Sequence, residues 1–335
     1  MNIGVIGAGG WGTTLAILLA EKGHNVGLWQ FESDQVERTI RTRENAVYLP
    51  GVRIPERVLI SDELSDIVPD QEMVVFAVPC QFARSVARQA ASMLAPKSLV
   101  VNVAKGIENV TLKRMSEVLL EEIGGLAPAR VATLSGPSHA EEVSRKIPTT
   151  VVTASKDQST AERIQDAFMT PNFRVYTNSD ILGVELGGAL KNVIALASGI
   201  CDGLGFGDNT KGALLTRGAA ETSRLGRAMG ACAETFAGLS GMGDLITTCI
   251  SPHSRNRHVG EEIGKGRSLD EVMRKLGGMV AEGVPTTRSA FQLSRKLSVE
   301  MPITDQMYKL LFEGKTPQDA VFDLMVRDAK PEVWA

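Results

Sequence analysis

The first 180 residues alternate short apolar runs with stretches in which apolar residues recur at helical spacing. The apolar runs are rich in β-branched residues and lack polar alternation, as expected for strands that helices cover on both faces. They lie at 3–6, 26–29, 73–78, 99–103, 131–134, 151–153 and 173–176. This alternation predicts βαβ units and a mainly parallel, doubly wound sheet.

Strand-like runs nearly vanish after Asp180, and helical patterns dominate the rest of the chain. The clearest helical stretches are 181–200, 209–230 and 269–276. No Ser/Gly-rich linker separates the two halves, so we expect the first long helix to begin at the boundary and to pack against the sheet. The predicted fold is therefore α/β, with a sheet domain over residues 1–180 and an all-α domain over residues 181–335.

A glycine-rich segment follows the first predicted strand directly. Residues 7–12 read Gly-Ala-Gly-Gly-Trp-Gly, which fits G-x-G-x-x-G, and a helix-like stretch follows at 13–22. In that context Gly7 permits the tight turn, Gly9 lets a pyrophosphate approach the backbone, and Gly12 lets the helix pack on the strand. Amides at the helix N-terminus supply the anion site. The segment predicts a Rossmann-type dinucleotide-binding domain.

The residues after the second predicted strand bear on the choice between NAD and NADP. Glu32 lies where an acidic group commonly binds the ribose 2′-hydroxyl of NAD. No Arg occurs between residues 30 and 37 to bind a 2′-phosphate. The alternative is that Phe31 covers the adenine while Glu32 points to solvent. We predict NAD or NADP as the cofactor, with a mild preference for NAD.

Two lysines stand out by their position. Lys191 is the only charged residue in the helical stretch 186–201. Burying an ammonium group is costly unless partners or a shifted pKa compensate, so Lys191 is a candidate acid/base group; the alternative is a lysine whose head reaches solvent. Lys105 directly follows the predicted strand 99–103, and ligands of open α/β sheets bind outside the carboxyl ends of strands. We expect both lysines at one cleft.

Two further segments offer hydrogen-bond donors to a ligand. The loop 135–140 leaves another predicted strand, and its Gly136 and Ser138 can present an amide and a hydroxyl. The turn 254–257 reads Ser-Arg-Asn-Arg, in which an Arg beside an Asn suits a phosphate ester. The alternative reading of that turn is surface charge.

Composition and charge narrow the function classes. The chain has 335 residues, of which 43% are hydrophobic, so a sizeable core can form. Its 36 Lys and Arg against 39 Asp and Glu leave no global basic field for a nucleic acid. Four separated cysteines favour reduced thiols, and we predict no metal site. No stretch approaches the ~18 apolar residues of a membrane span, so we predict no membrane insertion and a cytoplasmic location.

Glycine is in excess, and its distribution is uneven. Of the 33 glycines, five lie within the first twelve residues, where they form the dinucleotide loop. Fourteen lie between residues 183 and 243, around Lys191 and Asp244. This second group predicts close helix packing beside the substrate.

Seven sequence blocks in register resemble the NAD(P)-dependent glycerol-3-phosphate dehydrogenase family, most closely its bacterial members. They are GAGGWGT at 7–13, VAKGIE at 103–108, LSGPSHAEEV at 134–143, GALKNVIALASGI at 188–200, GLSGMGDLITTC at 238–249, SPHSRNR at 251–257 and VAEGVPT at 280–286. The resemblance implies an oxidoreductase that interconverts dihydroxyacetone phosphate and sn-glycerol 3-phosphate by hydride transfer at C2, and that supplies glycerol 3-phosphate for glycerophospholipid synthesis. It also implies a homodimer.

The resemblance further implies roles for individual residues. Lys191 is then the proton acceptor in the oxidation and the donor in the reduction, and Lys105, Asp244 and Thr248 complete its polar surroundings. The implied substrate contacts are Lys105, Gly136, Ser138, Lys191, Asp244, Ser254, Arg255 and Asn256. The cofactor contacts, from the glycine loop and the resemblance together, are Gly7, Gly9, Gly10, Trp11, Gly12, Phe31, Lys105, Ala140, Arg255, Val280 and Glu282. Residues 30–32 look more like the NAD-using eukaryotic members, which keeps the cofactor choice open.

Two other functions remain open on the residues alone. The first is another two-domain dehydrogenase of the 3-hydroxyisobutyrate or ketopantoate type. Such an enzyme also favours a lysine on the first long helix, but it does not require the phosphate-binding turn at 254–257. The second is a non-catalytic Rossmann protein that senses NAD, and the two lysines at the predicted cleft weigh against it.

Overall fold

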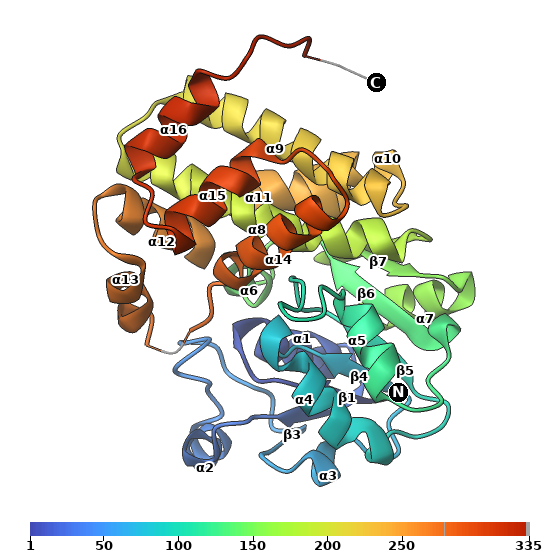
Figure 1. Ribbon diagram of the computed structural model, residues 1–335. Helices are drawn as coiled ribbons and strands as arrows, with labels where there is room; N and C mark the ends of the chain where they lie inside the picture. The colour runs from blue at the N-terminus through green and yellow to red at the C-terminus, as the bar shows by residue number, and fades with distance from the viewer. Residues whose placement is uncertain (278, 333–335) are drawn as a thin grey trace.

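The computed structural model describes residues 1–277 and 279–332. A sheet flanked by helices forms one half of the molecule, and a helical half lies above it (Figure 1). The strands are β1 (Asn2–Ile6), β2 (Asn25–Trp29), β3 (Val58–Ser61), β4 (Met73–Phe76), β5 (Leu99–Asn102), β6 (Val131–Ser135), β7 (Thr149–Ser155) and β8 (Phe173–Asn178). The helices that accompany the sheet are α1 (Gly10–Glu21), α2 (Ser33–Thr42), α3 (Leu64–Ile67), α4 (Cys80–Ala90), α5 (Met115–Glu122), α6 (Ala140–Val143) and α7 (Gln158–Phe168).

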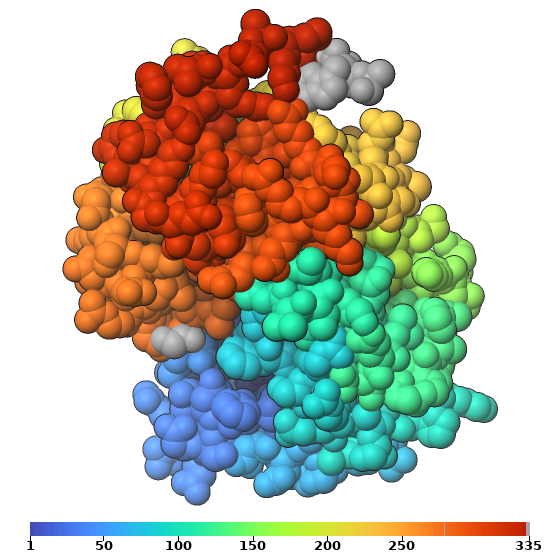
Figure 2. All heavy atoms as spheres, viewed as in Figure 1, coloured from blue at the N-terminus to red at the C-terminus, as the bar shows by residue number. Residues whose placement is uncertain are grey.

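The second half is built from helices throughout its described residues. They are α8 (Ile181–Gly203), α9 (Asp208–Ala228), α10 (Ala233–Ala237), α11 (Asp244–Ile250), α12 (Arg255–Gly264), α13 (Leu269–Lys275), α14 (Gly283–Lys296), α15 (Pro302–Phe312) and α16 (Pro317–Met325), with a short π-helix at Leu239–Gly243. The space-filling view shows the two halves in contact, with the surface hollowed within the blue and cyan part of the sheet half (Figure 2).

The predicted doubly wound, mainly parallel sheet is confirmed. Its strand order is β3-β2-β1-β4-β5-β6-β7-β8, and every neighbouring pair is parallel except β6 with β7. Each predicted strand has a counterpart. The edge strand β3 was not predicted, because a four-residue apolar run is too short to show a period, and Leu59 within it is 54% exposed.

The inner strands β1, β2, β4, β5 and β6 bury both of their faces, whereas the edge strands β3 and β8 are partly exposed. In β4, Met73 and Val75 join the core beneath α1 and α7, whereas Val74 and Phe76 join the core beneath α3, α4 and α5. The absence of polar alternation in the inner strands follows from this arrangement, since neither face of these strands meets water. The carboxyl ends of β1, β4, β5 and β6 consequently share one edge, at which the predicted site residues follow the strands.

Helix α8 is the centre of the helical half. By length and composition it could cross a membrane, but 94% of its most apolar window is buried inside the fold, which is the character of a core helix. Asp180 caps its N-terminus by accepting a hydrogen bond from the Gly183 amide at 2.8 Å. The helix packs against α9, α11, α12 and α14, as well as against β6.

Helices α8 and α12 meet backbone to backbone through glycines spaced four residues apart on each helix. A Cβ atom added to Gly199 would lie 1.9 Å from the Arg257 carbonyl oxygen, and one added to Gly260 would lie 2.0 Å from the Leu196 carbonyl oxygen. Gly203 and Gly264 face each other one turn further along. The predicted close packing of glycine-bearing helices is therefore confirmed.

This packing makes a stability prediction. Gly260→Ala places a methyl group against the α8 backbone, which cannot move aside as a side chain can, so we expect unfolding to become easier by about 1–3 kcal/mol or more. Gly212→Ala is the control, because Gly212 lies exposed in α9 with no other heavy atom within 4 Å of an added Cβ. Thermal unfolding of both variants checks the prediction, and equal melting temperatures would contradict it.

Candidate active site

The glycine loop has the shape that a dinucleotide requires. Gly7 has a φ of +111°, and a Cβ added to Gly12 would lie 1.8 Å from the Gly7 carbonyl oxygen. A Cβ added to Gly9 would meet nothing within 4 Å, which leaves room for a ligand at that point. No side chain caps the N-terminus of α1. The loop therefore fits a pyrophosphate held by backbone amides.

A second group of predicted residues lies at the carboxyl end of β5, where the two lysines share one buried carboxylate. Lys191, from α8, donates hydrogen bonds to Oδ1 of Asp244 and, at 2.6 Å, to the Thr248 hydroxyl. Lys105, from the turn after β5, donates to the other Asp244 oxygen at 2.8 Å. Asp244 and Thr248 stand one turn apart on α11, and both are buried. The structure thus brings all four predicted catalytic residues together.

The charges in this group act strongly on one another because water is excluded. Burial, and next the positive charge of Lys105, lower the pKa of Lys191 to about 8, although Asp244 opposes this shift. Burial alone would raise the pKa of Asp244, but the two lysines outweigh burial and hold that pKa below its ordinary value. Lys191 is therefore close to the balance between ammonium and neutral amine near neutral pH.

The loop after β6 completes one wall of this cluster. Lys105 donates to the Gly136 carbonyl oxygen at 2.8 Å and to the Ser138 hydroxyl at 3.2 Å. His139 follows, with a buried Nε2 atom that has no hydrogen-bond partner among the described residues. Burial first, and then the charges of Lys191 and Lys105, lower the pKa of His139. His139 is not among the predicted site residues, because the sequence around it does not show which way its side chain points.

The predicted phosphate-binding residues lie at the start of α12, on a helix rather than in a turn. Ser254 caps this helix by accepting from the Arg257 amide at 3.2 Å. Asn256 is buried and donates to Oδ1 of Asn192 at 2.9 Å. Arg255 is exposed, whereas Arg257 forms an ion pair with Asp202 at 2.7 Å. Of the two arginines in the segment, Arg257 is held in an ion pair, whereas Arg255 is exposed and lies close enough to Glu282 and Tyr48 for its charge to oppose the burial that raises their pKa values.

Asn192 connects the phosphate-binding residues to the lysine cluster. Its amide nitrogen donates to the Lys105 carbonyl oxygen at 3.0 Å, while its oxygen accepts from Asn256. Asn192 is not among the predicted site residues. The available signal was an amide side chain in an otherwise apolar helix, directly after Lys191.

Two of the predicted cofactor contacts, Glu282 and Trp11, carry buried polar atoms without a described partner. Glu282 accepts from the Cys80 amide at 2.9 Å through one oxygen, and its other oxygen is buried without a described partner. Burial raises the pKa of Glu282 to about 7, while Arg255 opposes the shift. Trp11 packs on Phe173 and also has a buried, unpartnered ring nitrogen. Such unsatisfied groups are what a bound ligand would satisfy.

Gly10, Ala140 and Val280 are further predicted cofactor contacts. A Cβ on Gly10 would approach the Ala140 side chain to 3.6 Å, so these two residues border each other across the loop. Val280 is half-buried just before α14. Among the described residues, no group of three or more His, Cys, Asp or Glu side chains is arranged to hold a metal.

Phe31 lies apart from the lysine cluster, after β2. Its ring is 73% exposed and stands 5.9 Å from the ring of Trp29. The neighbouring Glu32 accepts a hydrogen bond from the Tyr48 hydroxyl at 2.8 Å. The Tyr48 backbone in turn lies against Gly10. Glu32 is therefore tied to the glycine-loop side of the site. Phe82, an exposed ring early in α4, is a further aromatic at the same sheet edge that sequence reasoning missed.

Fold and site together are those of a dinucleotide-linked oxidoreductase, with a cluster of two lysines and an aspartate beside the carboxyl ends of the strands. Two family models match this chain. The model for the NAD-dependent glycerol-3-phosphate dehydrogenase N-terminus matches residues 2–161, and the model for the C-terminus of the same family matches residues 180–322. The chain belongs to this family of NAD-dependent glycerol-3-phosphate dehydrogenases. It is accordingly an oxidoreductase that uses NAD or NADP.

Known proteins support this assignment over the whole length. Glycerol-3-phosphate dehydrogenase (NAD(P)+) of Prosthecochloris aestuarii is 54% identical over 333 residues, which cover 99% of this chain and 100% of that protein. The crystal structure of glycerol-3-phosphate dehydrogenase from Coxiella burnetii is 37% identical, with a TM-score of 0.93 over 97% of this chain and 98% of that one. The resemblance of the seven sequence blocks is confirmed.

A ketopantoate reductase from Ralstonia eutropha JMP134 shares the fold alone. It is 17% identical, with a TM-score of 0.61 over 96% of this chain and 100% of that one. The alternative of a ketopantoate-type enzyme is therefore not favoured, since the glycerol-3-phosphate dehydrogenases match more closely in both sequence and structure.

The position of Glu32 yields a prediction on cofactor choice. A carboxylate beside the ribose repels a 2′-phosphate, so Glu32→Gln, which keeps the hydrogen bond to Tyr48, should shift the kcat/KM ratio toward NADPH by about tenfold. Glu37→Gln removes an exposed charge from the same helix and is the control. Initial rates with each reduced cofactor measure the ratio. An unchanged ratio would favour the alternative in which Phe31 alone covers the adenine.

Proposed function

We propose that this protein interconverts dihydroxyacetone phosphate and sn-glycerol 3-phosphate, with Lys191 as the group that exchanges a proton with the C2 oxygen. The observation that carries the proposal is the pairing of Lys191 and Lys105 with the two oxygens of the buried Asp244. With Lys191 in its ammonium form, two lysines and one aspartate leave one excess positive charge, which suits an anionic substrate and the negative charge that develops on its oxygen.

The proton transfer follows from the state of Lys191. In the oxidation its neutral amine accepts the proton of the C2 hydroxyl, and in the reduction its ammonium form donates that proton to the carbonyl oxygen. NAD or NADP, when bound, accepts or supplies the hydride at C2. Asp244 and Thr248 hold the Lys191 nitrogen in place, so the proton is exchanged from a fixed position.

The phosphate of the substrate has its proposed binding site at the N-terminus of α12. Arg255 offers a planar pair of donors, Asn256 an amide, and the helix end a favourable dipole. Asn192 fixes Asn256 relative to the Lys105 turn, so phosphate binding orients C2 toward Lys191. Gly136 and Ser138, which contact Lys105, border the same cluster.

The proposed cofactor contacts are those of the glycine loop, Phe31, Ala140, Arg255, Val280 and Glu282. We further propose that residues 1–180 and 181–335 form the two domains, of which residues 278 and 333–335 lie outside the described part of the chain. In the cell we propose a cytoplasmic homodimer that binds neither nucleic acid nor membrane and supplies glycerol 3-phosphate for glycerophospholipid synthesis.

The proposed reaction predicts a narrow substrate preference. Dihydroxyacetone phosphate should be reduced with NADH or NADPH, while unphosphorylated dihydroxyacetone should be a poor substrate because it lacks the group that α12 binds.

The proposed role of Lys191 predicts the effect of removing it. Lys191→Ala should abolish turnover and still bind the cofactor, since Lys191 lies on α8 and not in the glycine loop. Spectrophotometric rates and cofactor titration measure these effects. Equal activity on both ketones, or a near-normal rate in Lys191→Ala, would refute the proposal.

The lowered pKa of Lys191 predicts opposite pH profiles for the two directions. The neutral amine is the base, so kcat of the oxidation should rise with pH and level off above about 8. The ammonium form is the acid, so kcat of the reduction should fall as pH rises through about 8. Rates at saturating substrate from pH 6 to 10 give both profiles. Profiles with the same slope in both directions would contradict the assignment to Lys191.

A further inference from the structure

The turn that carries Lys105 is hydrogen-bonded from three helices. Residues 105–109 follow β5, and the Lys105 carbonyl oxygen accepts from Asn192 of α8 at 3.0 Å. The Ile107 carbonyl oxygen accepts from Ser289 of α14 at 3.1 Å and from Gln81 of α4 at 2.9 Å. Both halves of the molecule thus bond to this one turn.

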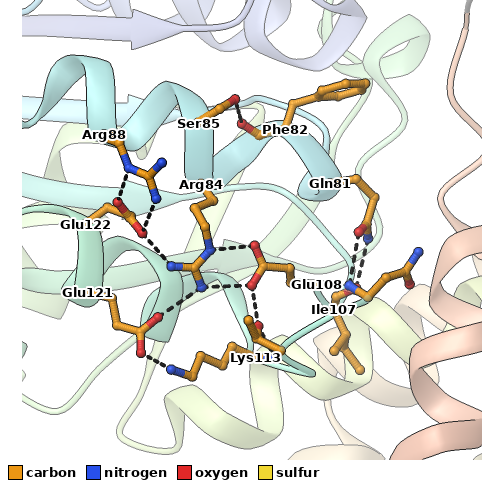
Figure 3. A network of polar contacts seen from close by, with 12 residues as sticks. Gln81, Phe82, Arg84, Ser85, Arg88, Ile107, Glu108, Lys113, Glu121 and Glu122 are labelled. Carbon is orange, nitrogen blue, oxygen red and sulfur yellow. Dashed lines mark hydrogen bonds and ion pairs between the residues drawn. The ribbon is translucent and has the colours of Figure 1, made fainter.

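Helix α4 makes the densest set of these contacts (Figure 3). Besides donating to Ile107, the Gln81 side chain accepts from the Asn109 amide at 3.0 Å, so its amide pairs with the turn in both directions. One turn further along α4, Arg84 donates two hydrogen bonds to the Glu108 carboxylate, each at 2.8 Å. The Glu108 side chain is only 11% exposed. A two-point arginine–carboxylate contact fixes direction as well as distance.

Arg84 also forms hydrogen bonds to α5, on the side away from the 105–109 turn. It donates to Glu122 at 2.5 Å and to Glu121 at 2.9 Å, both on α5. The hydrogen bonds of Arg84 first, with burial opposing them, lower the pKa of Glu108, so the pair stays ionised at neutral pH. The turn therefore has little freedom to move relative to α4 and α5.

We propose that Gln81 and Arg84 are positioning residues of the reaction: they hold the 105–109 turn so that the Lys105 nitrogen reaches Asp244, Gly136 and Ser138. This inference rests on the proposed function, in which Lys105 acts beside Lys191. A lysine side chain is flexible, so its nitrogen is placed only if its backbone is fixed. Small displacements of a catalytic group are costly to the rate.

Displacement of Lys105 would change the pKa of Lys191, whereas a loss of overall stability alone would not. The titratable and charged groups around Lys191 are Asp244 and Cys249 on α11, Lys105 on the turn, and His139 before α6. If Lys105 withdraws, Lys191 loses a like charge and keeps the whole of Asp244. Both changes raise the pKa of Lys191, so the pH profile of the oxidation moves to higher pH.

The test compares Arg84→Ala with Arg88→Ala in the full-length protein. Arg88 lies one turn further along α4, is 68% exposed, and bonds to Glu122 without touching the turn. We expect Arg84→Ala to lower kcat/KM for dihydroxyacetone phosphate by about 10–100-fold and to move the oxidation profile to higher pH. Arg88→Ala should stay within about twofold of the wild type on the same scale, with an unshifted profile. Gln81→Met, which removes only the amide, is the second variant should Arg84→Ala fail to fold.

Two further measurements separate positioning from stability. In a Lys105→Ala background, Arg84→Ala should lower the rate little further, because the residue it places is gone. Hydrogen–deuterium exchange of the 103–109 segment should quicken in Arg84→Ala and not in Arg88→Ala. An unshifted profile, a full multiplicative loss in the double variant, or unchanged exchange would overturn the positioning role. Wild-type turnover, measured first, tests the proposed reaction alone, and the exchange result stands whether or not turnover is seen.

Discussion

The carboxylate of Asp244 is the interaction on which the rest of the site depends. A buried aspartate is costly, and without it the buried Lys191 and the half-buried Lys105 would repel each other. Placed between them, the aspartate satisfies both through different oxygens. The three residues come from α11, α8 and the turn after β5, so the contact also joins the helical half to the sheet half. The same bonds hold the two halves together and keep the pKa of Lys191 from falling further, because Asp244 opposes the effect of burial.

Much of the remaining architecture serves to bring these segments together. The doubly wound sheet delivers the Lys105 turn and the 135–140 loop to one edge, since β5 and β6 are parallel neighbours. Close helix packing through Gly187 and Gly188 lets the π-helix ahead of α11 and the Lys105 side chain approach the backbone of α8. The glycines around Lys191 are therefore part of the site, although they carry no functional group.

The sequence predicted the sheet, the order of its elements and the residues that meet at its edge, because those features are local. Apolar runs without alternation indicate two-sided burial, and a lone lysine in an apolar helix indicates an unusual partner. Three residues near the site were not predicted, because each interacts with groups distant in the chain: Asn192, His139 and Gln81. Strand β3 escaped because an edge strand of four residues has too little pattern. The sequence predicts a turn where α12 begins at Arg255, because the first residues of this helix are charged or polar and show no apolar period.

The glycine contacts between α8 and α12 have a consequence for the size of substrate that the protein can accept. Lys191 stands on α8, and the proposed phosphate-binding residues open α12. Because Gly199 and Gly260 bring the two backbones into direct contact, the separation of these helices is set by main-chain atoms. Exchange of side chains cannot shorten that separation. The spacing between the backbones that carry Lys191 and the proposed phosphate-binding residues is thus fixed by main-chain packing, so in the proposed binding mode a longer substrate would require a different spacing of these two helices.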